Sequence, residues 1–184
     1  MRRSYAFLML AVAALLALPA IAEDAPKTKK IANPEYDNWA QFQVGAFVEM
    51  TTESEAMGQK STSTATTKLL ELTKEKAVVE TNMGIEGVPP MRRDVPKEIE
   101  VPDPTPDAKF KEGEETIDVA GTSMKCKTIE STTVTGDMTG TSKVWMSEQV
   151  PGRTAKMEVV SSGKVGDMVI TSKATSTVTK WSPK

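Results

Sequence analysis

The chain has 184 residues, with 23 basic and 25 acidic side chains and a formal net charge of −2. This balance, without a basic patch interleaved with aromatic residues, excludes nucleic acid as an expected partner. The sequence contains no histidine and one cysteine, which excludes an internal disulfide, most zinc and transition-metal sites and the commonest general base. We therefore expect a non-enzymatic protein without a metal ion or another cofactor.

The first residues have the pattern of a secretory signal peptide. A basic start is followed by an apolar run from Tyr5 to Leu18 and by a small-x-small site that ends at Ala22. The apolar run is shorter than the ~20 residues that span a bilayer, so a membrane anchor is disfavoured. We expect residues 1–22 to be removed, leaving no transmembrane anchor, and residues 23–184 to form a single β domain with a periplasmic or secreted location.

Asn33 followed by Pro34 is typical of a helix start, because the Asn side chain caps the helix and Pro suits its first turn. We expect one or two helical turns that pack Tyr36 or Trp39 onto a sheet; an irregular lead-in is the alternative.

Apolar residues then alternate from Phe42 to Met50, which predicts a β-strand. A turn at residues 57–59 and two further strands, 61–73 and 77–81, complete an antiparallel meander. With a loop at residues 73–76, Leu72 lies opposite Ala77 and Leu70 lies opposite Val79.

Residues 84–112 contain six prolines, which central strands exclude. We interpret this segment as a crossover between strands 3 and 4 of the sheet. Residues 97–101 could form a short edge strand. The alternatives are a binding loop or a boundary between two small domains.

The second half of the chain contains two predicted hairpins. A two-residue loop at Ala120-Gly121 places Ile117 opposite Met124 and Glu115 opposite Cys126. The second hairpin has its tight loop at Pro151-Gly152.

In that second register Val144 lies opposite Val159 and Met146 opposite Met157. A turn at residues 163–166 then leads to a last strand, in which Met168 and Ile170 share a face. Together these patterns predict an all-β protein: one strongly curved antiparallel sheet, an open or half barrel of about eight strands, with a short N-terminal helix.

Three features suggest chemistry, and each has a simpler interpretation. We expect Cys126 to be a buried, inert thiol, because the neighbouring lysines point to the opposite face of the strand. We interpret the acidic clusters at residues 98–103 and 112–115 as solvated edges, and Arg92-Arg93 as a surface pair. The methionine-rich composition fits either core packing or an adaptable apolar surface.

Three stretches resemble a group of small exported bacterial proteins, of the planctomycete type, whose function is unknown. They are residues 33–45, with Asn-Pro-Glu-Tyr and Trp39; residues 113–126, with Gly-Glu-Glu and Val-Ala-Gly; and residues 144–152, with Val-Trp-Met-Ser and Val-Pro-Gly. More distantly, the chain is similar to the half-barrels of the outer-membrane lipoprotein carrier type. The resemblance implies a curved β-sheet fold and carries no catalytic residues.

A single curved sheet leaves an apolar face that a short helix covers only in part, and such faces usually bind something. We expect an envelope protein that shelters an apolar small molecule or lipid in the concave face. The alternative is a structural or interaction module that meets an envelope protein through a sheet edge or the Pro-rich crossover. The residues expected to line or rim the face are Trp39, Phe42, Val44, Trp145, Met146, Met157, Met168 and Ile170.

Overall fold

The structure, a computed structural model, describes residues 28–102, 109–165 and 168–182. The expected signal peptide, residues 1–22, lies outside the described residues. The described elements are β1 (Thr28–Ala32), α2 (Pro34–Trp39), β2 (Phe47–Ala56), β3 (Gln59–Leu72), β4 (Lys76–Asn82), β5 (Met91–Pro96), β6 (Glu98–Pro102), β7 (Lys109–Val119), β8 (Thr122–Thr135), β9 (Met138–Met146), β10 (Thr154–Val165) and β11 (Met168–Ser182).

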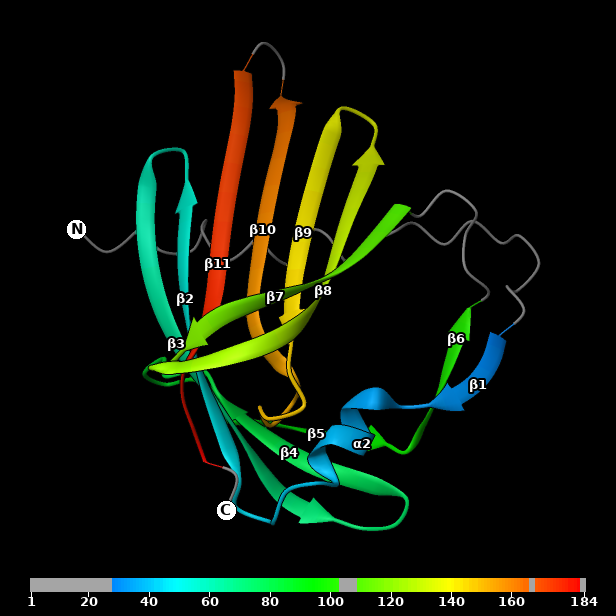
Figure 1. The fold of residues 1–184 in the computed structure, drawn as a ribbon. Coiled ribbons are helices and arrows are strands. Elements are labelled where there is room, and N and C mark those ends of the chain that lie inside the picture. The colour runs from blue at the N-terminus through cyan, green and yellow to red at the C-terminus, as the bar shows by residue number, and fades with distance from the viewer. Residues whose placement is uncertain (1–27, 103–108, 166–167, 183–184) are drawn as a thin grey trace.

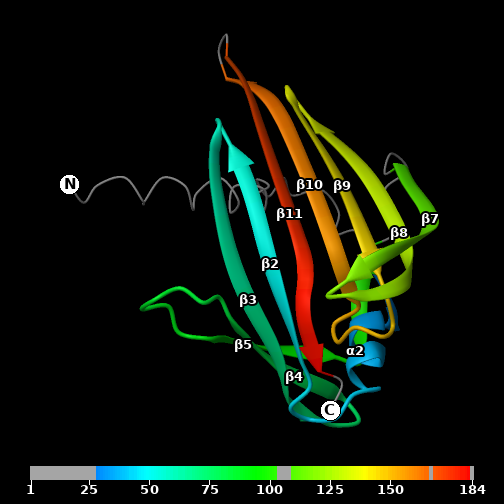
Figure 2. The same cartoon turned by 60° about the vertical axis from the view of Figure 1, so that its left-hand side comes forward.

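Nine of these strands form one antiparallel sheet in the order β5-β4-β3-β2-β11-β10-β9-β8-β7. Two meanders, β2 to β5 and β7 to β11, are joined by the pairing of β2 with β11. Figures 1 and 2 show that the sheet is strongly curved and does not close into a barrel. The expected all-β fold is therefore confirmed, with nine strands in the main sheet instead of about eight.

Two hairpin turns follow directly from local sequence. Ala120 and Gly121 both have positive φ, 46° and 80°, as a two-residue turn with the right twist requires. The predicted register is confirmed, with Ile117 opposite Met124 and Glu115 opposite Cys126. Met57-Gly58 forms the corresponding turn between β2 and β3.

The connection between β9 and β10 differs from the predicted tight turn. It is a loop over residues 147–153, and the register is shifted so that Val144 lies opposite Met157 and Met146 opposite Thr154. Val150 is fully buried, and the Gly152 amide donates to the Asn38 side chain at 2.7 Å. Packing of the loop on α2 thus overrides the local turn signal.

The helix start is confirmed, and the strand predicted directly after it begins later than expected. The Asn33 side chain accepts a hydrogen bond from the Glu35 amide, and Pro34 occupies the first turn. Strand β2 begins at Phe47, so Phe42 and Val44 lie in a turn and not in a strand. The reason is Gly45, whose φ of 97° interrupts the extended chain and whose amide donates to the Leu69 carbonyl at 2.8 Å.

The pairing of β3 with β4 differs from the expected one because β3 contains a β-bulge. Leu69, not Leu70, lies opposite Val79, because the register shifts between Leu69 and Glu71. The expected Leu72–Ala77 pair is confirmed. The turn predicted at residues 163–166 is also displaced: Gly163 lies inside β10 opposite Ile170, and residues 166–167 lie outside the described part of the chain.

The Pro-rich segment, residues 84–112, contains strands β5 and β6 and the start of β7. Strand β5 pairs with β4 and forms one edge of the main sheet, where prolines are tolerated. The strand considered at residues 97–101 is β6, which pairs with β1 in a separate two-stranded sheet. Residues 103–108 lie outside the described part of the chain.

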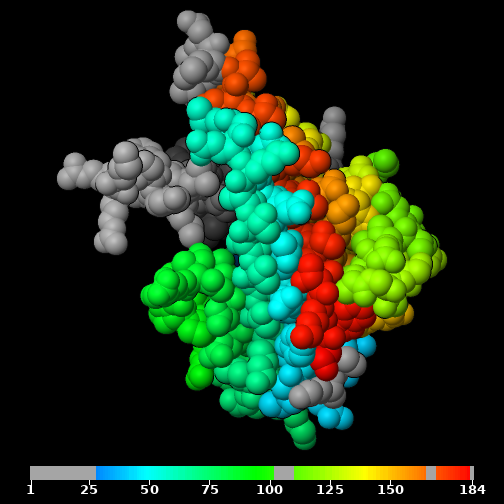
Figure 3. Space-filling model, turned by 90° about the vertical axis from the view of Figure 1, so that its left-hand side faces the viewer, coloured from blue at the N-terminus to red at the C-terminus, as the bar shows by residue number. Residues whose placement is uncertain are grey.

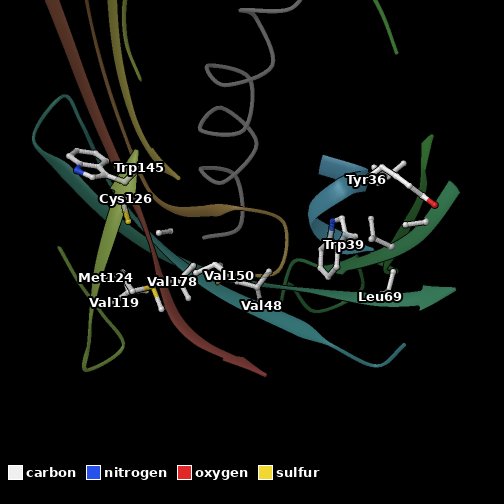
Figure 4. Packing of buried hydrophobic residues seen from close by; sticks show 14 residues of the cluster. Tyr36, Trp39, Val48, Leu69, Val119, Met124, Cys126, Trp145, Val150 and Val178 are labelled. Carbon is white, nitrogen blue, oxygen red and sulfur yellow. The ribbon is translucent and has the colours of Figure 1, made fainter. Parts of the chain in front are cut away.

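The core lies at one end of the sheet, where α2, the 147–153 loop and the β7–β8 hairpin meet. Figure 4 shows a band of buried side chains from Trp145, Cys126 and Met124 at one end to Leu69 and Tyr36 at the other. Figure 3 shows β2, β3 and β11 as a continuous wall, with the β7–β8 hairpin on one side and β5 on the other. At Gly113 the backbone of β7 lies close to the Thr128 side chain of β8, because a Cβ at this position would be 2.9 Å from Thr128 Oγ1.

Candidate functional site

One face of the sheet carries no charged side chain on its five neighbouring strands β9, β10, β11, β2 and β3. Side chains alternate along a strand, and cross-strand partners share a face. The pairs Met157–Ser176, Val159–Ala174 and Ser161–Ser172 lie on this face, which we call the uncharged face. Its residues, traced by register, are Val48, Met50, Thr52, Ser54, Ala56, Gln59, Ser61, Ser63, Ala65, Thr67, Leu69, Met138, Gly140, Ser142, Val144, Met146, Met157, Val159, Ser161, Gly163, Ile170, Ser172, Ala174, Ser176, Val178 and Trp181, and on β8 Ile129, Ser131 and Thr133. Charge returns at the β7–β8 edge of the same face, with Lys127 opposite Met146, Glu112 opposite Ile129 and Glu114 opposite Lys127.

Hydroxyl groups on the uncharged face bond to one another across the strands. The Ser131–Ser142 oxygens are 2.8 Å apart and the Ser161–Ser172 oxygens 2.7 Å apart. The same arrangement recurs at Thr52–Ser176, 2.8 Å, and at Ser54–Ser61, 2.7 Å. The face is thus polar without carrying charge, because each of these hydroxyls has a neutral partner beside it.

The size of the side chains changes along the strands of this face. The cross-strand row through Ser131, Ser142, Val159, Ala174, Ser54 and Ser61 consists of small residues. One step towards α2, the row contains Ile129, Val144 and Met157. Beyond it lie Met50 and the buried Val178. The Met157 row continues through Ser176, Thr52 and Ser63. At the other end of the face Met138 and Ile170 lie beyond the small residues, so large apolar residues flank a middle band of small ones.

Much of this face remains accessible. Met157 is 36% exposed, Met138 50% and Phe110, at the β7 end of the small-residue row, 63%. Helix α2 contacts β4 and β5, at the core end of the sheet. Large apolar groups that stay exposed in a monomer usually mark a contact surface.

The opposite face of the same strands is charged. The Trp145 indole N–H donates to Glu115 Oε2 at 2.7 Å, and Lys143 Nζ lies 2.5 Å from Glu115 Oε1 and 3.0 Å from Glu130. The ammonium groups of Lys143 and Lys156 lie 4.9 and 4.7 Å from the ring centre of Trp145. The Lys143 bond lowers the pKa of Glu115, and the Trp145 bond adds to that shift.

Of the eight residues predicted to line the site, two lie squarely on the uncharged face. Met157 pairs with Val144 and Ser176, and Ile170 pairs with Gly163. Met146 ends β9 opposite Thr154, at the core end of the face. The backbone of Met168 begins β11 opposite Val165, and its side chain lies outside the described part of the structure.

The other four predicted residues lie elsewhere. Trp39 is 1% exposed inside the core, where its indole donates to Glu35 Oε1 at 3.3 Å. Phe42 and Val44 lie in the turn before β2, with Val44 57% exposed. Trp145 points to the charged face. These four residues do not form a common rim.

Alternation in the sequence put Ser172 and Ala174 on one face with Ile170, but the predicted lining left out the small residues that give the face its character, above all Ser142, Ser161, Ser172 and Ala174. The signal was present in the alternation itself: from residue 170 to residue 178 every second position is uncharged and most are small. Serine and alanine are weak indicators of burial, so the predicted lining contained only larger apolar and aromatic residues.

Among the described residues no group of three histidine, cysteine, aspartate or glutamate side chains is arranged to hold a metal ion. Within the same ranges no helix is long and apolar enough to cross a membrane. The thiol of Cys126 is buried, and burial raises its pKa, which favours the unreactive protonated form.

No family model matches the chain, and no curated protein matches it. Among solved structures it is similar to the S-type phycobiliprotein lyase CPES of Guillardia theta, with 10% identity and a TM-score of 0.32, over 82% of this chain and 94% of the lyase. It is also similar to a DUF1329 family protein of Desulfovibrio piger, with 9% identity and a TM-score of 0.25, over 80% and 90% of the two chains. Likeness at this level carries no argument about function, so any assignment depends on the uncharged face.

Proposed function

We propose that this is an exported, non-enzymatic protein of the cell envelope, periplasmic or secreted, that shelters an apolar or lipid-like ligand on the uncharged face. The observation that carries the proposal is the sorting of the central strands, in which one face has no charge and the other holds the lysine and glutamate residues. The N-terminal sequence supports export.

The physical argument begins with the accessible apolar groups. An exposed Met or Phe forgoes about 1.5–3 kcal/mol relative to its buried state. Met157, Met138 and Phe110 all remain accessible on a face whose strands β9, β10, β11, β2 and β3 offer a ligand no charge to desolvate. Small residues such as Ser142 and Ala174 lie on the strands between them. An apolar ligand would recover this burial energy.

The edges of the sheet favour a ligand over a strand supplied by a protein partner. Edge strand β7 carries Lys111, Glu112, Glu114 and Glu115, and charges on an edge strand discourage strand addition. The other edge, β5, carries two arginines and ends at Pro96. Protein interaction through an edge is therefore the second candidate.

Two neighbouring valines of β10 provide a matched test. Val159 lies on the uncharged face opposite Ser142 and Ala174, and Val160 lies on the charged face opposite Thr141 and Lys173. Purified protein should enhance the fluorescence of a neutral hydrophobic dye, and Val159→Glu should abolish this binding. Val160→Glu introduces the same group one residue away and should leave dye binding intact.

Circular dichroism of both variants verifies that the sheet is retained. Met157→Glu provides a second variant on the same face and should also abolish dye binding. If the unmodified protein binds no dye, or if the two valine variants behave alike, the uncharged face is not the binding surface. A protein partner bound through a sheet edge then becomes the better explanation.

A further inference from the structure

The small hydroxyl-bearing residues Ser142, Ser161 and Ser172 lie in the middle rows of the uncharged face. Met138 and Ile170 lie beyond them, and a larger apolar group, with Ile129, Val144 and Met157, lies towards α2. We infer that the ligand is a neutral single-chain amphiphile, with a hydroxyl- or ester-bearing head over Ser142, Ser161 and Ser172 and a hydrocarbon chain directed along the strands towards Met157. This inference rests on the proposed function and adds the chemical class and the orientation of the ligand.

Neutrality follows from the absence of charge on the described residues of this face in β2, β3, β9, β10 and β11. A carboxylate or ammonium group placed there would lose water and meet no counter-ion, which costs several kcal/mol. The lysines of the same strands, such as Lys143 and Lys173, point to the opposite face. Over these five strands a fatty-acid anion therefore has no partner for its head, and the lysine of this face, Lys127, lies on β8 opposite Met146.

The hydroxyl pairs supply the hydrogen bonds that a neutral head requires. In the Ser161–Ser172 pair one hydroxyl donates to the other at 2.7 Å. That bond uses one of the two hydroxyl hydrogens, so the second can donate to an ester carbonyl or a hydroxyl of the ligand. The Ser131–Ser142 pair offers the same on the neighbouring strands. A purely hydrocarbon ligand would leave these groups without partners.

The orientation follows from the order of residues along β10 and β11. Ser161 and Met157 are four residues apart on one face, about 13 Å at the usual rise of a strand. Ala174 and Ser176 continue the surface on β11 between these points. Towards α2 the chain of the ligand would meet Met50 and Val144, while its head would stay among the serines.

Three ligands with the same hexadecyl-length chain separate the possibilities: a monoacylglycerol, a fatty acid and a primary alkylamine. Each is titrated against the dye-loaded protein below its micelle concentration, at a pH where the acid and the amine are charged. The monoacylglycerol should displace the dye about tenfold more tightly than either charged ligand. Equal or tighter displacement by the fatty acid or the amine would overturn the inference about the head group.

A charge introduced among the small residues tests the position of the head. Ala174→Lys should shift the preference towards the fatty acid by about tenfold or more, because the new ammonium group supplies the missing counter-ion. Thr175→Lys, one residue along and on the charged face opposite Glu53 and Glu158, should leave the preference unchanged. Ser172→Lys serves as a second variant if Ala174→Lys fails to fold. No change of preference in a folded variant would place the head elsewhere.

The two levels of the proposal fail in different ways. If neither the dye nor any of the three ligands binds, the proposed function is wrong. If they bind without discrimination by charge, the uncharged face still binds apolar molecules and the assignment of a neutral head is wrong.

Discussion

The indole N–H of Trp145 donates to the Glu115 carboxylate at 2.7 Å, and this bond ties β9 to β7 across the intervening strand β8. Lys143 bonds the second oxygen of the same carboxylate. Although Trp145 is large and apolar, it is 4% exposed on the charged face, covered by lysine side chains. The bond therefore holds the base of the β7–β8 hairpin to the sheet.

This bond should give the protein an acid-sensitive side-chain signal. The pKa of Glu115 is lowered by Lys143 and then by Trp145, so the folded value lies below the unfolded value of about 4.3. The stabilisation is complete above the unfolded pKa and is lost as the pH falls through the folded pKa. The indole N–H resonance of Trp145, followed by NMR, should shift over that acidic window and be displaced at neutral pH in Glu115→Gln.

Glu114 provides the control for this titration. Its pKa is also lowered, by Lys125, but its side chain points to the other face of β7. Glu114→Gln should leave the Trp145 resonance and its titration unchanged. If the Trp145 resonance were the same in Glu115→Gln as in the parent protein, the structural role given to the Trp145–Glu115 hydrogen bond would be contradicted.

Asn38 should be the most sensitive polar residue of the core. Its amide donates to the Glu148 carbonyl at 3.1 Å and accepts from the Gly152 amide at 2.7 Å, with no exposed surface. Asn38→Leu removes the partners of two backbone groups, the Glu148 carbonyl and the Gly152 amide, and should cost about 2 kcal/mol of unfolding free energy. Urea denaturation measures this loss, provided that the dependence of the unfolding free energy on urea concentration is unchanged. The control, Asp37→Asn on the exposed side of α2, should have an unfolding free energy within about 0.5 kcal/mol of the parent.

Cys126 should be inert in the folded protein. It is 1% exposed and packs in the core together with Met124, and burial raises the pKa of its thiol. A thiol reagent should label it only after denaturation, and Cys126→Ala should retain ligand binding at a cost of about 1 kcal/mol. Rapid labelling of the native protein would show that the β7–β8 hairpin opens readily.

Processing of the N-terminus is a further prediction. The sequence predicts cleavage after Ala22, so the exported protein should begin at Glu23. N-terminal sequencing of protein recovered from the periplasm or the medium tests this. Full-length protein retained in the membrane fraction would contradict it.

Local patterns predicted the parts of this fold that local physics determines. The Ala120-Gly121 turn and the Asn33-Pro34 helix start were correct because the turn requires positive φ and the helix requires a cap, both within a few residues. The Leu69–Val79 pair was missed because a bulge shifts the register without a distinctive residue to mark it. The 147–153 loop was missed because its partner, Asn38, is distant in sequence.

The candidate site was predicted only in part, for a related reason. Alternation placed Met157 and Ile170 on one face, where the registers also put them, whereas Trp145 was assigned to the rim by residue type. Because side chains alternate along β9, Trp145 and Val144 point to opposite faces. The burial of Trp145 depends on Glu115, Lys143 and Lys156. Sequence alone does not reveal such partners.

The pairing of β2 with β11 constrains the order in which the protein can fold. Residues 47–56 pair with residues 172–182, so a strand in the middle of the sheet is synthesised after the other eight strands of that sheet. Until it arrives, each meander presents an unpaired edge, and distant pairings of this kind form slowly. A chain shortened at its C-terminus would lose the seam between the two halves, and the cell would have to keep the nascent protein from aggregating until β11 is available.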